Sequence, residues 1–518
     1  MRALLKKHSL RIAVFITGGA VLVIEVLATR ILAPHFGNTI FTVSSVLGVV
    51  LAALSTGYYA GGKLADRSPS ERYFFGLIAL SGGAVVLFQN IGSSALPALQ
   101  GAFSVVEGPL ALSLLLFFAP AFLLGMLSPY AVKLSAMRSP AEGIGSAAGT
   151  IFFWSTLGSI AGSLLAGFVL IPRFGTARIM LGTGVLLLLL GLAGLAPFLN
   201  GPRNRSARFF LLLLLTASAL AAALTLLARP GANILYRADG VYERITIYDG
   251  VFSGRPARFL AQDRTASGAM FLDTDDPRDL VYDYTRYYTL YKVFAPHPKR
   301  ALVIGGGAYS IPKALLAELP EVTVEVAEIE PGLFGLAKQF FRAAENPRLY
   351  PLTEDGRRFL AHSPIRYNLM VSDVYYSLYS VPIHFTTREF FALARQRLAD
   401  GGLFIANVIG DLAAEPPSLI ASEVKTFRSV FPNSYFFAAD SPEQRAAQNI
   451  IFVGVNGTRA FDISTSSLAA FSDPLLRSIP ARRIAPETLN LDVHPVLTDD
   501  FAPVEYLTAA TLRRNSVR

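Results

Sequence analysis

The sequence Ala-Leu-Val-Ile-Gly-Gly-Gly at residues 301–307 joins a short apolar run to three consecutive glycines. An apolar run of this length is typical of a strand that is buried on both faces of a parallel sheet. The glycines predict a tight turn after the strand, where the backbone can approach a ligand closely. The motif alone does not decide between a nucleoside site and an ordinary turn.

Helical and strand patterns alternate after this motif. Residues 311–319 and 332–343 have helical spacing, whereas 322–329 and 367–371 have the composition of strands. This alternation predicts a doubly wound, Rossmann-like α/β domain over residues 301–518, in which ligands bind beyond the carboxyl ends of the strands. Glycines and carboxylates stand at those ends and together resemble an S-adenosylmethionine-type site: Gly305, Gly306, Gly307, Glu328, Asp355, Gly356 and Asp373.

The segment before the motif has a different pattern. Residues 242–260 alternate β-branched or aromatic residues with polar ones, and glycine-containing turns interrupt them, which predicts a small antiparallel sheet. Residues 280–295 have helical spacing and an aromatic face. We therefore expect a small β subdomain with a connecting helix over residues 230–300.

The first 229 residues differ in composition from the rest. The whole chain is 52% hydrophobic and only 16% charged, and the deficit of charge is concentrated before Arg229. Apolar stretches long enough to cross a bilayer predict about seven transmembrane helices. They lie near residues 11–32, 39–61, 73–95, 108–132, 146–171, 177–199 and 208–228.

The loops between these stretches carry unequal positive charge. Clusters such as Arg2, Lys6 and Lys7 at the N-terminus and Arg203 and Arg205 in the sixth loop all fall on one side. The excess of positive charge places the N-terminus in the cytoplasm. Seven crossings would then place everything after Arg229 outside.

Composition also excludes several classes of function. The net charge of +9 does not indicate a nucleic-acid partner, because many of the basic residues lie in membrane loops and no basic run with interleaved aromatics is present. The chain has no Cys and only six scattered His residues, so no metal site is predicted.

Several motifs resemble a known family. The stretches EVLATRILAPHFG (25–37), GYYAGGKLAD (57–66) and LGSIAGSLLAGFVLIP (157–172) are similar to the membrane part of bacterial proteins fused to a spermidine-synthase domain. LVIGGG (302–307), AEIE (327–330), DGR (355–357) and VSD (371–373) follow the order of the spermidine synthase motifs, over about residues 240–410. The resemblance implies a multi-pass protein of the bacterial inner membrane, with the lipid bilayer as a partner and homodimers as a possibility.

The resemblance also implies a reaction. Its enzymes transfer an aminopropyl group from decarboxylated S-adenosylmethionine to a small-molecule amine in polyamine biosynthesis, without a metal. Asp373 would be the catalytic residue, and the glycine turn, Glu328, Asp355 and Gly356 would bind the donor. Tyr282, Asp283 and Tyr376 would lie in the substrate pocket.

The sequence departs from the family where carboxylates are expected. Ala308, Tyr309 and Ser310 follow the glycines in place of Asp-Gly-Gly, and Tyr376 replaces an aspartate of the catalytic loop. Two alternatives therefore stay open: a methyltransferase that uses S-adenosylmethionine itself, and a non-catalytic membrane protein that binds a nucleoside or assists transport. The aromatic replacements suit a less cationic acceptor.

Overall fold

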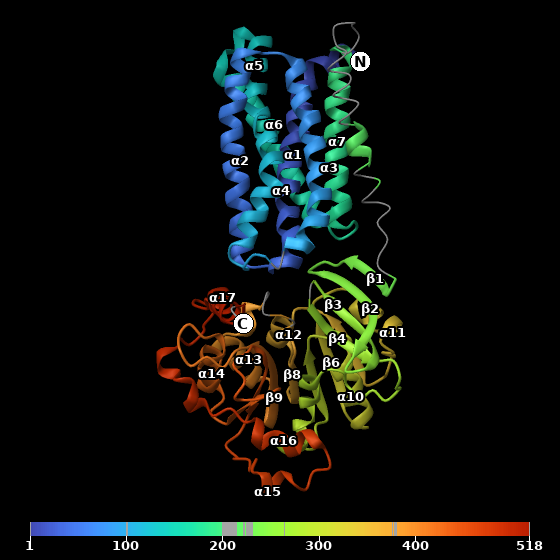
Figure 1. Cartoon of the computed structure of the whole chain (residues 1–518), viewed down its shortest axis with the longest axis vertical. Coiled ribbons are helices and arrows are strands. Elements are labelled where there is room, and N and C mark those ends of the chain that lie inside the picture. Colours follow the sequence, from blue (N-terminus) through green and yellow to red (C-terminus); the bar gives the residue numbers. More distant parts are fainter. Residues whose placement is uncertain are drawn as a thin grey trace. The chain divides into compact units, whose positions relative to one another are not determined.

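The computed structural model describes residues 2–99, 102–198, 215–220, 223, 232–263, 265–375, 377 and 381–516. The chain divides into two compact units, residues 1–230 and 231–518 (Figure 1). The predicted fold class is confirmed: a helical first part precedes a small antiparallel sheet and a doubly wound α/β domain. Each unit has its own hydrophobic core.

The first unit is a bundle of long apolar helices. Six helices of the described residues are long and apolar enough to cross a membrane, and each coincides with one of the first six predicted spans. The seventh predicted span, residues 208–228, falls mostly outside the described residues. The helices are α1 (Arg2–Phe36), α2 (Ile40–Arg67), α3 (Glu71–Leu99), α4 (Gly108–Gly125), α5 (Leu127–Arg138), η1 (Pro140–Glu142), α6 (Gly143–Leu165), the π-helical η2 (Ala166–Leu170), α7 (Thr176–Leu195) and η3 (Ala196–Phe198).

The helices of this bundle pack mainly in pairs, α1 with α6, α2 with α4 and α3 with α7. Glycines permit the close approach of α1 and α6. A Cβ atom at Gly158 would collide with the carbonyl oxygen of Phe15, and one at Gly162 would collide with that of Gly19. Small residues at such contacts are the usual device of membrane helix packing.

The small sheet at the start of the second unit has four antiparallel strands in the order β1-β2-β3-β4. The sequence pattern identified this sheet over a shorter range. The pairing of β3 with β4 shifts by one residue between Leu260 and Ala261. The strands are β1 (Ile234–Asp239), β2 (Arg244–Phe252), β3 (Arg255–Gln262) and β4 (Thr265–Phe271).

The connecting segment is helical, as predicted, but only its end is α-helical. Residues Asp283–Leu290 form the 3-10 helix η5, and Tyr291–Phe294 form α9. In a 3-10 helix side chains three residues apart lie above one another. Tyr288 and Tyr291 accordingly stack with their ring centroids 6.4 Å apart.

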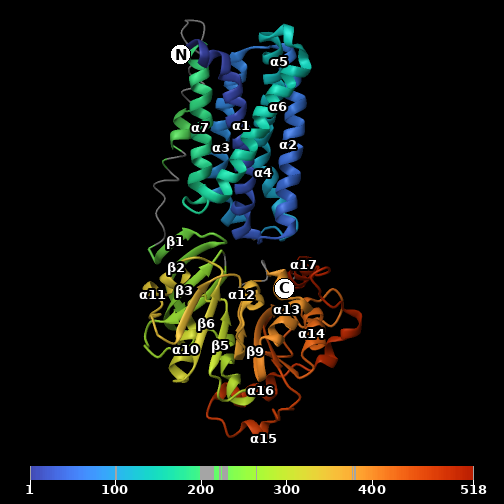
Figure 2. The same ribbon diagram turned by 180° about the vertical axis from the view of Figure 1, so that it is seen from behind.

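The main sheet has seven strands in the order β10-β11-β9-β8-β5-β6-β7. Its strands β5, β6 and β9 are labelled in Figure 2. Strands β7, β6, β5, β8 and β9 are parallel, and β11 and β10 complete the sheet in antiparallel pairings. The strands are β5 (Arg300–Ile304), β6 (Thr323–Glu328), β7 (Leu349–Thr353), β8 (Tyr367–Ser372), β9 (Leu398–Gly410), β10 (Ser434–Ala438) and β11 (Gln448–Val455).

Helices cover both faces of this sheet. Ala301 and Val303 of β5 belong to a core shared with α10, α11 and α16, whereas Leu302 and Ile304 belong to a core shared with α12, α13 and α14. This is why the strand is apolar at each of these four positions. The helices are α10 (Ser310–Glu318), α11 (Leu333–Phe340), α12 (Gly356–His362), η6 (Ile383–Phe385), α13 (Arg388–Gln396), α14 (Leu419–Val430), α15 (Thr465–Leu468), α16 (Pro474–Arg482), η7 (Pro486–Leu489), η8 (Leu491–Val493) and α17 (Val504–Ser516).

The strand order reverses between β5 and β8, since the chain runs from β5 outward to β6 and β7 and then returns to β8. In open α/β sheets ligands bind at such a switch point, in the crevice outside the carboxyl ends of the strands. The residues after Ile304 and after Ser372 therefore lie where a ligand is expected to bind.

Candidate functional site

The glycine turn closes directly over the switch point. Gly305 has φ +92°, and a Cβ atom there would collide with the carbonyl oxygen of Asp373. The backbone N–H of Asp373 donates to the carbonyl of Ile304 over 2.8 Å. The loops after β5 and β8 thus approach so closely that only glycine fits at position 305.

Glu328, the last residue of β6, is buried behind this turn. Its carboxylate accepts hydrogen bonds from the backbone N–H of Gly306 at 2.7 Å and of Glu330 at 2.8 Å. Burial raises the pKa of Glu328, and the backbone bonds oppose that shift. The carboxylate is therefore fixed against the glycine turn, with lone pairs left for a ligand hydroxyl.

Asp373 follows β8 and lies at the centre of a polar chain. Asn407 of β9 donates from Nδ2 to Asp373 Oδ1 over 2.9 Å, and Asn449 of β11 donates to Asn407 Oδ1 over 2.8 Å. Burial raises the pKa of Asp373 to about 6, against the lowering effect of hydrogen bonds from Asn407 and Tyr284. A carboxylate in this range is ionised at neutral pH and basic enough to accept a proton.

A small cavity lies against the glycine turn and Asp373, and Glu328 is not among the residues that line it. Gly305, Gly306, Gly307, Tyr282 and Asp373 all line it, so the structure brings together the predicted glycine turn, one predicted substrate residue and the predicted catalytic residue. Tyr284, Thr285, Ala308 and Ser310 line it as well. Asp373 is the single carboxylate among the described residues of its lining.

Two other predicted substrate residues do not join this cavity. The side chain of Asp283 is 70% exposed and lies 3.7 Å from Arg286. It points away because η5 turns with three residues per turn, which sends neighbouring side chains to different sides. Tyr376 lies outside the described residues.

Asp355 and Gly356 lie beside the end of β5 but not in the lining of the cavity. Asp355 caps α12 by accepting from the backbone N–H of Arg358 at 2.8 Å, and its other oxygen is 3.0 Å from Nε2 of His384. The bond with His384 is the main cause that lowers the pKa of Asp355. A Cβ atom at Gly356 would collide with the side chain of Ile304.

Tyr309, one of the departures from the family pattern, is a core residue. It has φ +56° at the start of α10, is buried, and packs with its ring centroid 4.9 Å from that of Phe334. A Cβ atom at Gly306 would lie 2.8 Å from the Tyr309 ring. The ring thus supports the glycine turn from behind.

Two functional candidates were missed by the sequence analysis. Glu243 of the turn before β2 is buried, accepts from Gln262 Nε2 at 2.6 Å, and has a second oxygen without a hydrogen-bond partner. Burial, followed by the charges of Asp263 and Glu328, raises its pKa to about 8. Asn407 is the other, and a signal for it existed: it is the polar residue inside the apolar run LFIANVIG at residues 403–410.

Comparison with known proteins gives one consistent description. No protein-family model matches the sequence. A polyamine aminopropyltransferase of Vibrio vulnificus is 25% identical over 282 residues, which cover 52% of this chain and 91% of the relative. Polyamine aminopropyltransferase 2 of Streptomyces coelicolor is 26% identical over 435 residues, which cover 78% of this chain and 74% of the relative.

Among solved structures, a probable spermidine synthase from Corynebacterium glutamicum aligns with 53% of this chain and 99% of its own, at 21% identity and a TM-score of 0.43. The Streptomyces alignment extends into the apolar helices, because residues 231–518 are little more than half of the chain and the alignment covers 78% of it. Spermidine synthase-like homologues thus cover the C-terminal part of this chain, which follows a part with six apolar helices of membrane-spanning length among its described residues.

Proposed function

We propose that this protein is a membrane-bound aminopropyltransferase of polyamine biosynthesis. Its second unit would transfer the aminopropyl group of decarboxylated S-adenosylmethionine to a small-molecule amine. The observation that carries the proposal is the position of Asp373, held by Asn407 at the switch point of the sheet and beside the glycine turn. The names of the relatives agree with this reaction.

The proposed step needs a base and little else from the protein. The amine nitrogen attacks the propyl carbon bound to the sulfonium, a C–N bond forms, and the C–S bond breaks. Its electrons neutralise the sulfur, so neutral methylthioadenosine leaves. The acceptor attacks as the free amine, so Asp373 would accept the proton that its ammonium form loses, and binding beside the glycine turn would align donor and acceptor.

The donor would lie along the glycine turn. The glycines keep this turn free of side chains, so a nucleoside would lie against its backbone, and Glu328 behind the turn has lone pairs for the ribose hydroxyls. Asp355 already caps α12 and contacts His384, so it would contact only the edge of the adenine ring of the donor.

The cavity favours an acceptor of low positive charge. A dication needs several carboxylates, and Asp373 is the one carboxylate of the described lining, among Tyr282 and Tyr284. We therefore propose an acceptor with one amino group or with a second amine far from the reacting one. The same lining suits the alternative of a methyltransferase that uses S-adenosylmethionine itself.

The products separate these possibilities. Purified full-length protein in detergent would be incubated with decarboxylated S-adenosylmethionine or S-adenosylmethionine and a panel of mono- and diamines. We expect methylthioadenosine from the first donor, with Asp373→Asn as the inactive control. S-adenosylhomocysteine from the second donor would instead establish a methyltransferase. If neither donor binds and no product forms, the alternative of a non-catalytic protein would be favoured.

A further inference from the structure

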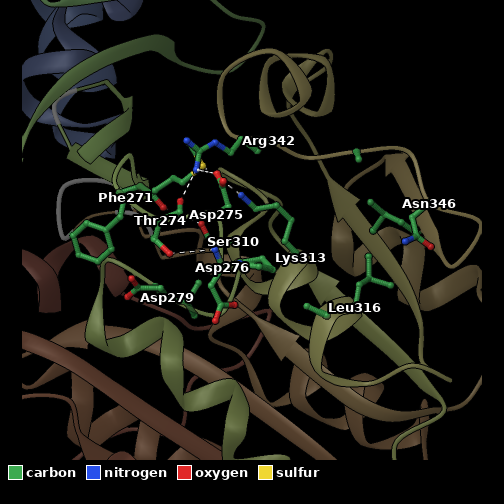
Figure 3. A pocket seen from close by; sticks show the side chains of 17 residues that line it. Phe271, Thr274, Asp275, Asp276, Asp279, Ser310, Lys313, Leu316, Arg342 and Asn346 are labelled. Atoms are coloured by element: carbon green, nitrogen blue, oxygen red, sulfur yellow. Dashed lines mark hydrogen bonds and ion pairs between the residues drawn. The ribbon is translucent and has the colours of Figure 1, made fainter. Parts of the chain in front are cut away.

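A second cavity of about 310 Å³ is lined by residues of β4 and α10, among them Phe271, Ser310 and Lys313 (Figure 3). Ala269 and Ser310 line both cavities, and Ser310 donates from Oγ to the carbonyl of Ala269 over 3.1 Å. Neither the glycine turn nor Asp373 reaches the second cavity. It is therefore separate from the proposed active site, although the two share a wall.

Three carboxylates line this second cavity, and each has an arginine partner. Asp275 pairs with Arg342 at 2.9 Å, Asp276 with Arg278 at 2.9 Å, and Asp279 with Arg255 at 2.8 Å. Arg342 is further held by hydrogen bonds to the carbonyls of Thr274 and Leu272. The aspartates therefore offer little attraction to a cation.

Among the described residues of the lining, Lys313 of α10 is the cation that forms no ion pair. Its Nζ donates to the carbonyl of Phe341 over 2.5 Å and lies 4.0 Å from the sulfur of Met270. Among the residues described, no carboxylate is within ion-pairing distance of it. Burial lowers the pKa of Lys313 to about 8, and the neighbouring Arg342 contributes to that shift. An ammonium in such surroundings gains from a bound anion.

The rest of the lining is mostly apolar, with one amide. Leu316, Ala317 and Leu349 form a hydrophobic side (Figure 3). The carbonyl oxygen of the Asn346 side chain accepts from the backbone N–H of Arg348 at 2.9 Å, so its NH₂ group is the donor that stays for a ligand. A cavity of this size with few polar groups on an apolar lining is typical of small-molecule sites.

We infer that this second cavity binds a small organic anion, with a carboxylate or phosphate group at Lys313 and an apolar body against Leu316 and Leu349. Asn346 supplies a second donor. Lys313 by itself would suit any inorganic anion. The apolar residues of the lining are what favour an anion that also has an apolar body.

Four probes with the same ring test the inference: benzoate, phenyl phosphate, benzyl alcohol and benzylamine. Their binding to full-length protein in detergent would be measured by calorimetry. We expect saturable binding of one or both anions, and the stronger of the two identifies the preferred head group. Lys313→Met should weaken that binding by about tenfold or more, as expected for the loss of a charge-assisted bond.

The matched control is Lys338→Met, which removes an exposed lysine that pairs with Glu345 at 2.8 Å. It should leave anion binding within about twofold. Leu316→Trp keeps Lys313 but fills the cavity, and it should abolish binding without changing the melting temperature. The inference is overturned if no anion binds saturably, if benzylamine or benzyl alcohol binds as well as the anions, or if Lys313→Met at an unchanged melting temperature binds like the wild type.

Discussion

At the residue scale, Asp373 sets the pH dependence of the proposed reaction. Its pKa is raised to about 6 by burial, and the base must be ionised to accept a proton. We expect the rate of methylthioadenosine release at low substrate to rise with pH and to level off above about 6. Asp373→Asn should abolish turnover and leave nucleoside affinity within a few fold. A fully active Asp373→Asn protein would rule out this residue as the base.

Asn407 should act on the reaction through Asp373. Its donated hydrogen bond stabilises the ionised carboxylate and so lowers the pKa of Asp373. Asn407→Ala removes that bond, and we expect the acid limb of the pH–rate profile to move toward higher pH. Asn433→Ala is a suitable control, because the side chain of Asn433, just before β10, donates to the carbonyls of Gly457 and Arg459. A lower rate with an unmoved profile would indicate a purely structural role for Asn407.

Glu243 should lower the stability of the protein progressively as the pH rises from 4.5 to about 8. Its folded-state pKa of about 8 exceeds the usual 4.5, so between these values the folded protein holds a proton that the unfolded chain releases. The free energy of unfolding therefore falls as pH rises through that window. Glu243→Gln keeps the bond that Gln262 donates and removes the titration.

We expect the Glu243→Gln protein to match the wild type near pH 4.5 and to become more stable by about 1–3 kcal/mol toward pH 8, the scale of a buried unsatisfied polar group. Melting temperatures in detergent across this range measure the difference. A gap that does not change with pH would contradict the assignment of the raised pKa to Glu243.

The predicted site residues that lie near one another in the structure share one property: each stands at the carboxyl end of a strand. Gly305, Glu328 and Asp373 could be placed because parallel strands end at a common edge, so position in the chain gives position in the fold. Glu243 and Asn407 could not, because they meet the site through pairings between segments far apart in the sequence. Asp283 was misplaced since the pattern of tyrosines did not distinguish a 3-10 helix from an α-helix.

At the element scale, the two pairs of glycines in α6 have different surroundings. In the sequence, Gly145 with Gly149 and Gly158 with Gly162 give two small-xxx-small spacings, and both suit close helix packing. In the structure a Cβ atom would collide with α1 at Gly158 and Gly162, but would meet nothing within 4 Å at Gly145 and Gly149. Spacing predicts that a helix can pack closely, and only the neighbours decide where it does.

This difference supports a prediction for the α1–α6 pair. Gly158→Leu would force a side chain into the backbone of Phe15, and overpacking of this kind typically costs about 1–3 kcal/mol. We expect a lower melting temperature in detergent and a smaller yield of folded protein. Gly149→Leu, on the same helix but in open space, is the matched control and should behave like the wild type. Equal loss in both variants would show that α6 tolerates leucine nowhere, whatever its neighbours.

At the scale of the whole molecule, the compositional boundary near Arg229 coincides with the division of the structure at residue 230. Long apolar runs and an alternating α/β pattern are strong signals, so the class of each half could be read from sequence. The antiparallel strands β10 and β11 could not, because their order in the sheet depends on pairing and not on local pattern.

Two expectations about whether residues 208–228 cross the membrane exclude each other. The apolar length of this stretch predicts a seventh crossing, which would place residues 231–518 outside. The proposed reaction requires a donor that is made in the cytosol, and six crossings would keep the second unit there with the N-terminus. The function that we propose therefore predicts that residues 208–228 do not cross the membrane.

Reporter fusions at the C-terminus decide between them. A fluorescent protein that matures only in the cytoplasm should be bright after Arg518, and alkaline phosphatase at the same point should be inactive. The same pair fused after Arg173, between the fifth and sixth predicted spans, provides the opposite control, because the charge pattern predicts this loop on the side away from the positive clusters. Active phosphatase at the C-terminus would mean that the glycine turn and Asp373 face a compartment without the proposed donor, and aminopropyl transfer would then have to be abandoned even if the purified protein binds methylthioadenosine.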